Sequence, residues 1–377
     1  MEVQEKKEDP FPKRIKTQQP SDPKEEEDDR ISSLPDRLII DEILSKLPLT
    51  KDAIRTGTLS KRWQNLWPSV PCLSFQDFDM KHRLPDFYTF VNQTLNRRSH
   101  PEFKNLNKFC ICATYDHQFE PHVDNWIRFV INSKVQSLEF YLGADDILGQ
   151  YMLKDDSFFI NSHFTHLSLD GCILKPTGRI SWTNLTYLSI INGLLGERMI
   201  AKIQSGCPLL ETLSLSDCYG FSCLDITSIS VKNLEFHGYN RQDQGVLDNI
   251  IKINAPYIET LAIKGMLVSK IYLQDVSCLD KAELDFSKWA HDETTSKEEK
   301  EEMLIMIILG LYHVEEVIIG EACLPAFRRL RAKGLIFPYN LKVVKVSHPV
   351  YDSDDSTEVD DCFDSDSSDD DSSVSDS

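Results

Sequence analysis

Residues 210–218, LETLSLSDC, decide the fold of this chain because they hold a short apolar unit that returns along most of the sequence. The unit has the form apolar-x-x-apolar-x-apolar, here Leu210, Leu213 and Leu215, and Cys218 follows it. Residues 258–266, IETLAIKGM, and residues 185–190, LTYLSI, repeat the pattern. The alternation at its end predicts a short strand with one buried face.

Copies of this unit recur between residues 69 and 348. Their middle positions are Leu73, Phe109, Leu138, Leu167, Leu188, Leu213, Leu234, Leu261, Ala282, Val317 and Val344. Most steps between them lie within the roughly 20 to 29 residues of a leucine-rich repeat, which supplies one parallel strand and a return segment. The longest steps, 36 and 35 residues, indicate insertions or misplaced copies. We therefore predict an α/β leucine-rich repeat solenoid over residues 77–348.

Apolar residues at helical spacing precede several of these strands. They occupy residues 87–95, 123–131, 199–203, 247–251 and 304–311, which predicts helices in the return segments. A doubly wound sheet would also alternate helix and strand, but no glycine-rich phosphate loop follows any predicted strand. Cys172 and Cys218 fall where a leucine-rich repeat turns its backbone out of the strand. The solenoid is the favoured fold.

A helical module precedes the repeats in residues 31–75, ISSLPDRLIIDEILSKLPLTKDAIRTGTLSKRWQNLWPSVPCLSF. Pro35 suits the first turn of a helix that Pro48 ends, and Thr50 is expected to cap a second helix that closes at Gly57. The third segment places Leu59, Leu66 and two tryptophans on one face, leaving Ser60, Lys61, Arg62 and Gln64 to water. So small a module buries little of its own surface, which predicts a partner.

This module resembles the plant branch of the F-box family in its LPD start at residues 34–36 and its LSKRWQNLW end at residues 59–67. The resemblance implies that residues 30–76 bind a Skp-type adaptor, and through it the cullin and RING subunits of a ubiquitin ligase. The residues carried over as adaptor contacts are Leu34, Pro35, Leu38, Ile43, Leu44, Leu59, Trp63 and Trp67. Gly57 and Thr58 depart from the family pattern. With the irregular repeats, the resemblance extends to plant F-box/leucine-rich repeat proteins over residues 30–348.

The concave face of the solenoid is a candidate surface for an unknown target protein. Its candidate residues are Ser137, Glu139, His166, Ser168, Tyr187, Ser189, Thr212, Ser214, Asn233 and Glu235, followed by Thr260, Lys281 and Glu283. They are small, polar and mixed in charge. A binding groove and a merely solvated sheet face both fit this composition.

Charge and motif content limit the other functions. The net charge is −19, and residues 352–377 alone carry 12 acidic residues without a Lys or Arg, which leaves −7 for the rest. This balance argues against nucleic acid as a partner. The scattered histidines and ten cysteines form no catalytic or metal motif, so we expect a non-catalytic protein without a cofactor, its cysteines reduced. No signal peptide or membrane span is recognisable, which predicts an intracellular protein, nuclear, cytoplasmic or both.

Both termini are predicted to be disordered. Residues 1–29 are rich in charge and proline, and residues 12–16, PKRIK, resemble a nuclear import signal. Residues 349–377 form an acidic Ser/Asp tail. Thr357, Ser367, Ser368 and Ser373 each precede an acidic residue by three positions, which suits acidophilic kinases. The alternative is that this tail only keeps the protein soluble.

The sequence thus supports two functions of different classes. The first is the substrate-recognition subunit of a Skp-cullin-F-box type ubiquitin ligase. The second is a non-ligase acidic leucine-rich repeat protein that binds histones or other basic proteins. Residues 34–67 separate them, because the first function requires this helical module and the second gives it no role.

Overall fold

The computed structural model describes residues 31, 33–77, 83–100, 103, 106–143, 149–239, 250–288, 293–334 and 343–346. The chain divides into an N-terminal unit that ends at Pro71 and a repeat unit that begins at Cys72. The boundary precedes residue 76 because residues 72–76 already pair with the next strand of the repeat sheet. The predicted leader, the import-like segment, the acidic tail and its four candidate phosphorylation sites lie outside the described residues.

Short helical segments follow one another in the N-terminal unit. The first run is α1 (Asp36–Leu38), η1 (Ile39–Ile43) and η2 (Leu44–Lys46); the second is α2 (Thr50–Arg55) and η3 (Thr56–Thr58); the third is α3 (Lys61–Gln64) and η4 (Trp67–Ser69). Pro35 precedes the first run, where its missing amide costs nothing. Ser60 caps α3 by accepting a hydrogen bond from the Trp63 amide at 3.4 Å. The predicted Thr50 cap is wrong, since Leu49 holds the capping position and Thr50 is buried in the first turn.

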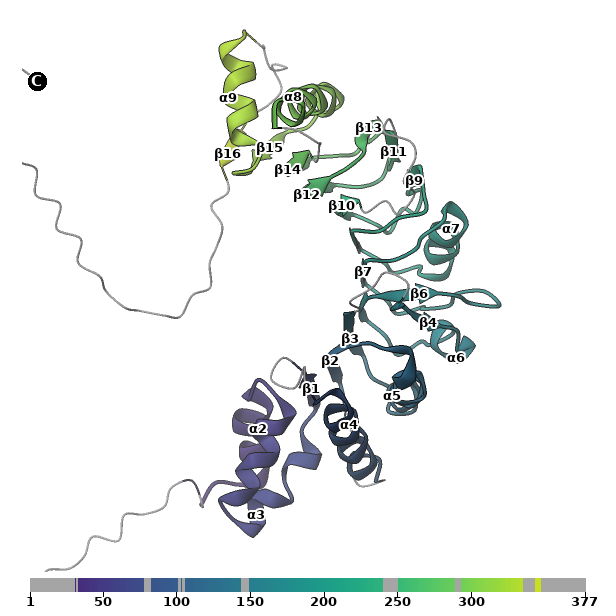
Figure 1. The fold of residues 1–377 in the computed structure, drawn as a ribbon, viewed down its shortest axis with the longest axis vertical. Coiled ribbons are helices and arrows are strands. Elements are labelled where there is room, and N and C mark those ends of the chain that lie inside the picture. The colour runs from purple at the N-terminus through teal and green to yellow at the C-terminus, as the bar shows by residue number, and fades with distance from the viewer. Residues whose placement is uncertain are drawn as a thin grey trace, which may run out of the picture. The chain divides into compact units, whose positions relative to one another are not determined.

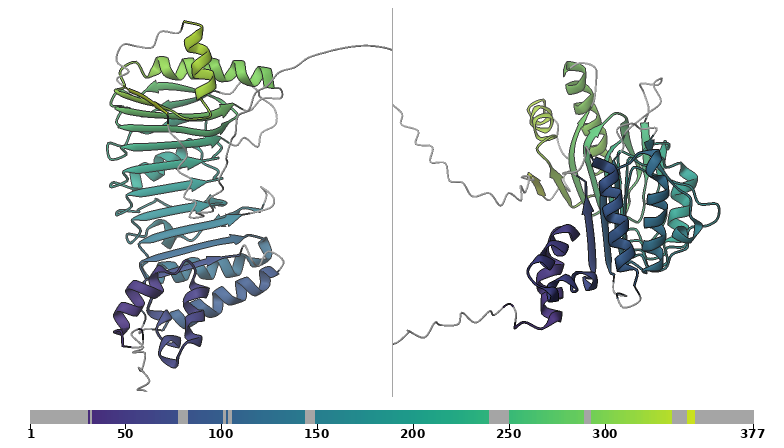
Figure 2. Two further views of the ribbon diagram at one scale, coloured as in Figure 1. Left: turned by 90° about the vertical axis from the view of Figure 1, so that its left-hand side faces the viewer. Right: turned by 60° about the horizontal axis from the view of Figure 1, so that its bottom comes forward.

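Within the described residues, eleven strands form one sheet in which all neighbouring strands are parallel. In spatial order they are β1 (Cys72–Gln76), β2 (Lys108–Thr114), β3 (Ser137–Gly143), β5 (His166–Asp170), β7 (Tyr187–Ile191), β8 (Thr212–Ser216), β10 (Asn233–Tyr239), β12 (Thr260–Leu267), β14 (Lys281–Lys288), β15 (Glu316–Ile319) and β16 (Val343–Val346). Figure 2 shows them stacked as successive rungs. Each strand therefore pairs with the next repeat along the chain, as in a leucine-rich repeat fold.

The register of this sheet matches the predicted repeat. Leu73 pairs with Phe109, Phe109 with Leu138 and Leu138 with Leu167, and the same row continues without a shift through Leu213 and Ala282 to Val344. Up to Val317 these side chains are buried. Parallel pairing in identical register places like residues side by side, so one apolar position per repeat builds a continuous core row.

Helices and short strands form the return layer behind the sheet (Figure 1). The helices are α4 (Leu84–Arg98), η6 (His117–Phe119), α5 (Glu120–Asn132), α6 (Asp156–Phe159), α7 (Glu197–Gly206), α8 (Glu293–Gly310) and α9 (Leu324–Ala332). β4 (Tyr151–Leu153) pairs with β6 (Cys172–Leu174), and β9 (Cys223–Asp225), β11 (Ile250–Asn254) and β13 (Lys270–Asp275) form a third sheet. The two long repeat intervals hold α4 and α8, so they are longer return segments rather than misplaced copies.

One predicted helix is wrong. Residues 250 and 251 belong to strand β11, in which Ile251 and Ile253 are buried and alternate with more exposed neighbours. β11 pairs in parallel with β9 and β13 and forms the middle of the three-stranded sheet. A short cluster of β-branched residues fits either helical or strand spacing, and here the neighbouring strands decide.

A left-handed residue follows each of β5, β7 and β8, and another lies near the end of each of the next two strands, β10 and β12. Gly171, Asn192, Asp217, Gly238 and Gly265 have φ values of 67°, 53°, 49°, 63° and 78°, and each lies four residues after its repeat's middle position. A Cβ on Gly171 would lie 2.0 Å from the Leu142 carbonyl oxygen. Glycine, Asn and Asp adopt this conformation most readily, which explains their recurrence here. Cys172 and Cys218 follow this turn and are buried, as the repeat pattern predicts.

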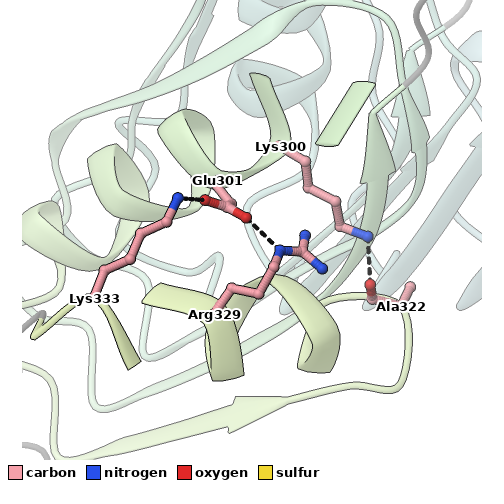
Figure 3. Close-up of polar contacts among 5 residues, drawn as sticks. All are labelled: Lys300, Glu301, Ala322, Arg329 and Lys333. Atoms are coloured by element: carbon pink, nitrogen blue, oxygen red, sulfur yellow. Dashed lines mark hydrogen bonds and ion pairs between the residues drawn. The ribbon is translucent and has the colours of Figure 1, made fainter. Parts of the chain in front are cut away.

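Helices α8 and α9 are joined by one nearly buried carboxylate. The Glu301 side chain accepts hydrogen bonds from the Arg329 Nε and, at 2.7 Å, from the Lys333 Nζ, while Lys300 donates to the Ala322 carbonyl (Figure 3). Glu301 is only 9% exposed. The two cations hold the pKa of Glu301 below its usual range. This charged contact fastens the last described helix to the one before it.

Replacing Glu301 with glutamine is expected to lower the free energy of unfolding by about 1 to 2 kcal/mol, because Arg329 and Lys333 lose their partner but stay partly hydrated. Because the pKa of Glu301 is lowered in the folded chain, its contribution to stability is fully present above the ordinary glutamate pKa of about 4.3. This contribution is lost as the pH falls through the lowered pKa of the folded chain. Urea unfolding at pH 7 and pH 3 measures both effects. Glu302→Gln removes an exposed ion pair to Lys270 and is the matched control. Equal losses in both variants at pH 7 would contradict this role.

Candidate partner-binding surfaces

The predicted adaptor contacts in the N-terminal unit divide into accessible and buried residues. Leu38 is 46% exposed and Leu59 68% exposed. Pro35 is also exposed, and Leu34 and Ile43 are half-buried. The remaining three, Leu44, Trp63 and Trp67, are buried in the folded chain. They stabilise the fold, whereas the accessible residues can meet a partner directly. That these residues bind an adaptor stays a prediction.

Arg62 links the two segments that carry the exposed leucines. Its Nε and Nη2 lie 2.7 and 2.6 Å from the Asp36 carboxylate, and it also donates to the Leu34 carbonyl. The start of α1 is thereby tied to α3, close in sequence to Leu38 and Leu59. Sequence reasoning left Arg62 to water, because a partner 26 residues away gives no local signal.

The predicted concave-face residues lie in two adjacent rows of the sheet. The outer row contains Ser137, His166, Tyr187, Thr212, Asn233, Thr260 and Lys281. The middle row contains Glu139, Ser168, Ser189, Ser214, Glu235 and Glu283, with Ala262 between the last two. Figure 1 shows the return helices on the opposite side of the strands. That these residues bind a target stays a prediction.

The three serines of the middle row are less accessible than a solvated face implies. Ser168, Ser189 and Ser214 are 8%, 6% and 5% exposed. They alternate with core leucines along their strands, so they face away from the core but lie between larger neighbours. The centre of the face is therefore recessed.

Sequence reasoning missed a third row. Tyr141, Asp170, Ile191, Ser216, His237 and Lys264 pair in sequence across the same face, two residues beyond the middle row. The alternation of side chains along each strand could have predicted this row, because residues two apart lie on the same face. The repeat unit recognised in the sequence ends before the residues of this row. The candidate surface is wider than predicted.

Side-chain contacts fix much of the outer row. The Asn233 amide donates to Thr212 Oγ1 at 3.1 Å and its carbonyl oxygen accepts from Thr260 at 2.6 Å. The rings of His166 and Tyr187 stack with centroids 5.8 Å apart. These contacts fix the side-chain conformations of the outer row in the free chain.

The charges of this face are mostly paired within the chain. Lys108 lies 2.6 Å from Glu139, and Lys264 lies 2.9 Å from Glu283. Lys281 lies 3.8 Å from Glu316. Glu235 differs, since its ion-pair partner among the described residues is His237 at 4.0 Å. Burial lowers the pKa of His237, so this ring is neutral near pH 7, and within the described residues no charged side chain then pairs with Glu235.

A cavity of about 630 Å³ lies in the return layer and is lined by residues of α7, β9 and the segment that follows β9. Several polar side chains that line this cavity form hydrogen bonds within the chain. Gln204 donates to the Asp225 carbonyl and accepts from the Thr227 and Ser228 amides, and Glu197 accepts from the Ser222 amide. The Gln204 and Glu197 side chains are therefore occupied by contacts within the chain.

The described ranges contain no group of three His, Cys, Asp or Glu side chains that could hold a metal ion. In the same ranges, no helix is both long and apolar enough to cross a bilayer.

This chain is similar to F-box proteins of plants. The leucine-rich repeat model of the FBD-associated F-box protein At5g56370 matches residues 123–284. The F-box protein At5g03100 of Arabidopsis thaliana is 33% identical over 82% of this chain and 94% of its own length. The putative F-box protein At1g49610 of the same plant is 34% identical over 83% of this chain and 75% of its own. The Arabidopsis F-box/LRR-repeat protein At3g03360 is 31% identical over 82% and 63%.

No solved structure matches the chain. The full-length similarity to F-box proteins, the matched repeat model and the continuous parallel sheet agree with one another. The chain belongs to the plant F-box/leucine-rich repeat family.

Proposed function

We propose that this chain is the substrate-recognition subunit of a Skp-cullin-F-box type ubiquitin ligase. The N-terminal unit binds a Skp-type adaptor, which connects it to the cullin and RING subunits, and the repeat unit binds the target protein. A ubiquitin-ligase role is usual for F-box/leucine-rich repeat proteins, which are typically non-catalytic adaptors. Such a subunit would work inside the cell, in the nucleus, the cytoplasm or both.

The observation that carries this proposal is the exposure of Leu38 and Leu59 in a small helical unit of a chain from this family. Exposed leucines on a unit that has its own buried core, and whose segments the Arg62–Asp36 ion pair also links, suit a hydrophobic docking surface. The alternative, a non-ligase protein that binds histones or other basic proteins, leaves this surface without a role.

Purified full-length chain and a recombinant plant Skp-type adaptor are expected to form a one-to-one complex with a Kd of about 1 µM or tighter. Isothermal titration calorimetry gives the affinity, and gel filtration with light scattering gives the stoichiometry. Neither binding heat nor co-elution, for a chain shown to be folded by circular dichroism, would overturn the proposal.

A further inference from the structure

We propose that the target segment on the concave face is an extended peptide with an arginine or lysine that pairs with Glu235, while its backbone hydrogen-bonds to Ser189 and Ser214. This inference rests on the proposed function and deepens it by giving the chemistry of the target. We call Ser189, Ser214 and Glu235 the Ser-Ser-Glu row.

The three residues of the Ser-Ser-Glu row lie side by side on neighbouring strands. Ser189 on β7 pairs in register with Ser214 on β8, and Ser214 pairs with Glu235 on β10. Neighbouring strands lie about 4.8 Å apart, so the row presents two hydroxyls and a carboxylate over about 10 Å. An extended peptide of three or four residues has this length.

The two hydroxyls are available to a ligand. Ser189 and Ser214 are more than nine-tenths buried, they point away from the core, and neither hydroxyl has a hydrogen-bond partner in the described part of the chain. Neither hydroxyl is among the fully buried polar atoms that lack a partner in the described residues, so both still reach solvent. A peptide that lies on this face replaces that water with its own amide and carbonyl groups.

Glu235 has room for a cationic side chain. Its neighbours in the middle row are Ser214 and Ala262, which are both short. The Glu235 side chain is 41% exposed.

The charges of the face select a basic rather than an acidic partner. Lys108, Lys264 and Lys281 each lie within 4.0 Å of a glutamate of their own chain. An acidic or phosphorylated segment would have to displace these pairs. A basic side chain meets Glu235 and, at the end of β8, Asp217, whose carboxylate lies beside Gly238. Complementary charge therefore favours an arginine or lysine here.

Random 12-residue peptides displayed on phage, selected on the full-length chain, test this proposal. Enriched peptides are expected to share an arginine or lysine at one position. Synthetic, fluorescein-labelled copies then report affinity by anisotropy. Glu235→Gln is expected to weaken binding about three- to tenfold, the range of a partly exposed ion pair. Glu235→Lys should instead select peptides with Asp or Glu at that position, which a merely structural role would not produce.

Glu211→Gln is the matched control, because Glu211 is an exposed residue just before β8 and its loss changes the charge equally. Its affinity should equal that of wild type. A peptide consensus without a basic residue, no consensus at all, or equal loss in both variants would each overturn the inference. Adaptor binding, measured on the same samples, separates the two claims: a chain that binds adaptor but not basic peptides overturns only this inference. A chain that binds basic peptides but no adaptor overturns only the proposed function.

Discussion

Replacing Leu38 and Leu59 together with glutamate is expected to weaken adaptor binding at least about a hundredfold. Both leucines are exposed, and they come from segments that Arg62 ties together. A leucine that becomes buried at the centre of an interface commonly contributes about 2 kcal/mol, so losing two of them and burying charge in their place exceeds a factor of 100. Calorimetric titration of the double variant with the adaptor measures the change.

The double variant should keep its fold, because neither side chain belongs to the core of the N-terminal unit. Leu44, Trp63 and Trp67 would give an ambiguous test, since they are buried and their replacement would unfold the unit. Leu209→Glu is the matched control, because Leu209 is 52% exposed in the repeat unit. It should bind adaptor as wild type does. Unchanged affinity in the Leu38/Leu59 double variant would remove these leucines from the docking surface.

Replacing Trp182 with alanine is expected to lower the free energy of unfolding of its repeats by about 3 to 5 kcal/mol. Trp182 is fully buried, and its Nε1 donates to the Phe158 carbonyl at 2.8 Å. Its ring packs against Phe158 and Phe159 at centroid distances of 6.0 and 5.9 Å. Alanine would leave a cavity and an unpaired buried carbonyl.

Hydrogen exchange in increasing urea is the suitable measurement, because solenoid repeats contact only their neighbours and destabilisation should be largest near β5, β7 and β8. Trp182→Phe keeps most of the ring volume but loses the hydrogen bond, so its effect should be intermediate. Tyr312→Ala, at a residue 63% exposed, is the control and should change stability by less than about 0.5 kcal/mol. Uniform loss across all repeats would contradict nearest-neighbour stabilisation.

The repeat sheet could be predicted closely from sequence. Each predicted middle position, from Leu73 to Val344, lies in one uninterrupted register row. The register was predictable because a strand with an apolar-x-apolar pattern can bury its apolar side chains in only one way. A slip of one residue would expose all of these side chains. Even Ala282, the smallest of these residues, follows the rule and is fully buried.

The candidate sites were less predictable. Periodicity marked Trp63 and Leu59 as one apolar face, yet the first is buried and the second exposed. Periodicity also predicted that Ser189 and Ser214 face away from the core, but it did not predict that both residues are more than nine-tenths buried. Burial on the outer side of a strand depends on the neighbours across the sheet, and these come from repeats 21 to 25 residues away.

The repeating strands and the core-facing side of each strand could be predicted from local alternation and spacing, and the family from the motifs of residues 34–36 and 59–67. Only the folded structure shows that residues 250–254 form a strand, that Arg62 joins two helical segments, and that His237 is the ion-pair partner of Glu235 among the described residues. The first two depend on groups that are distant along the chain. Pairing energies between such groups act only after folding brings them within hydrogen-bond distance, so no local pattern can report them.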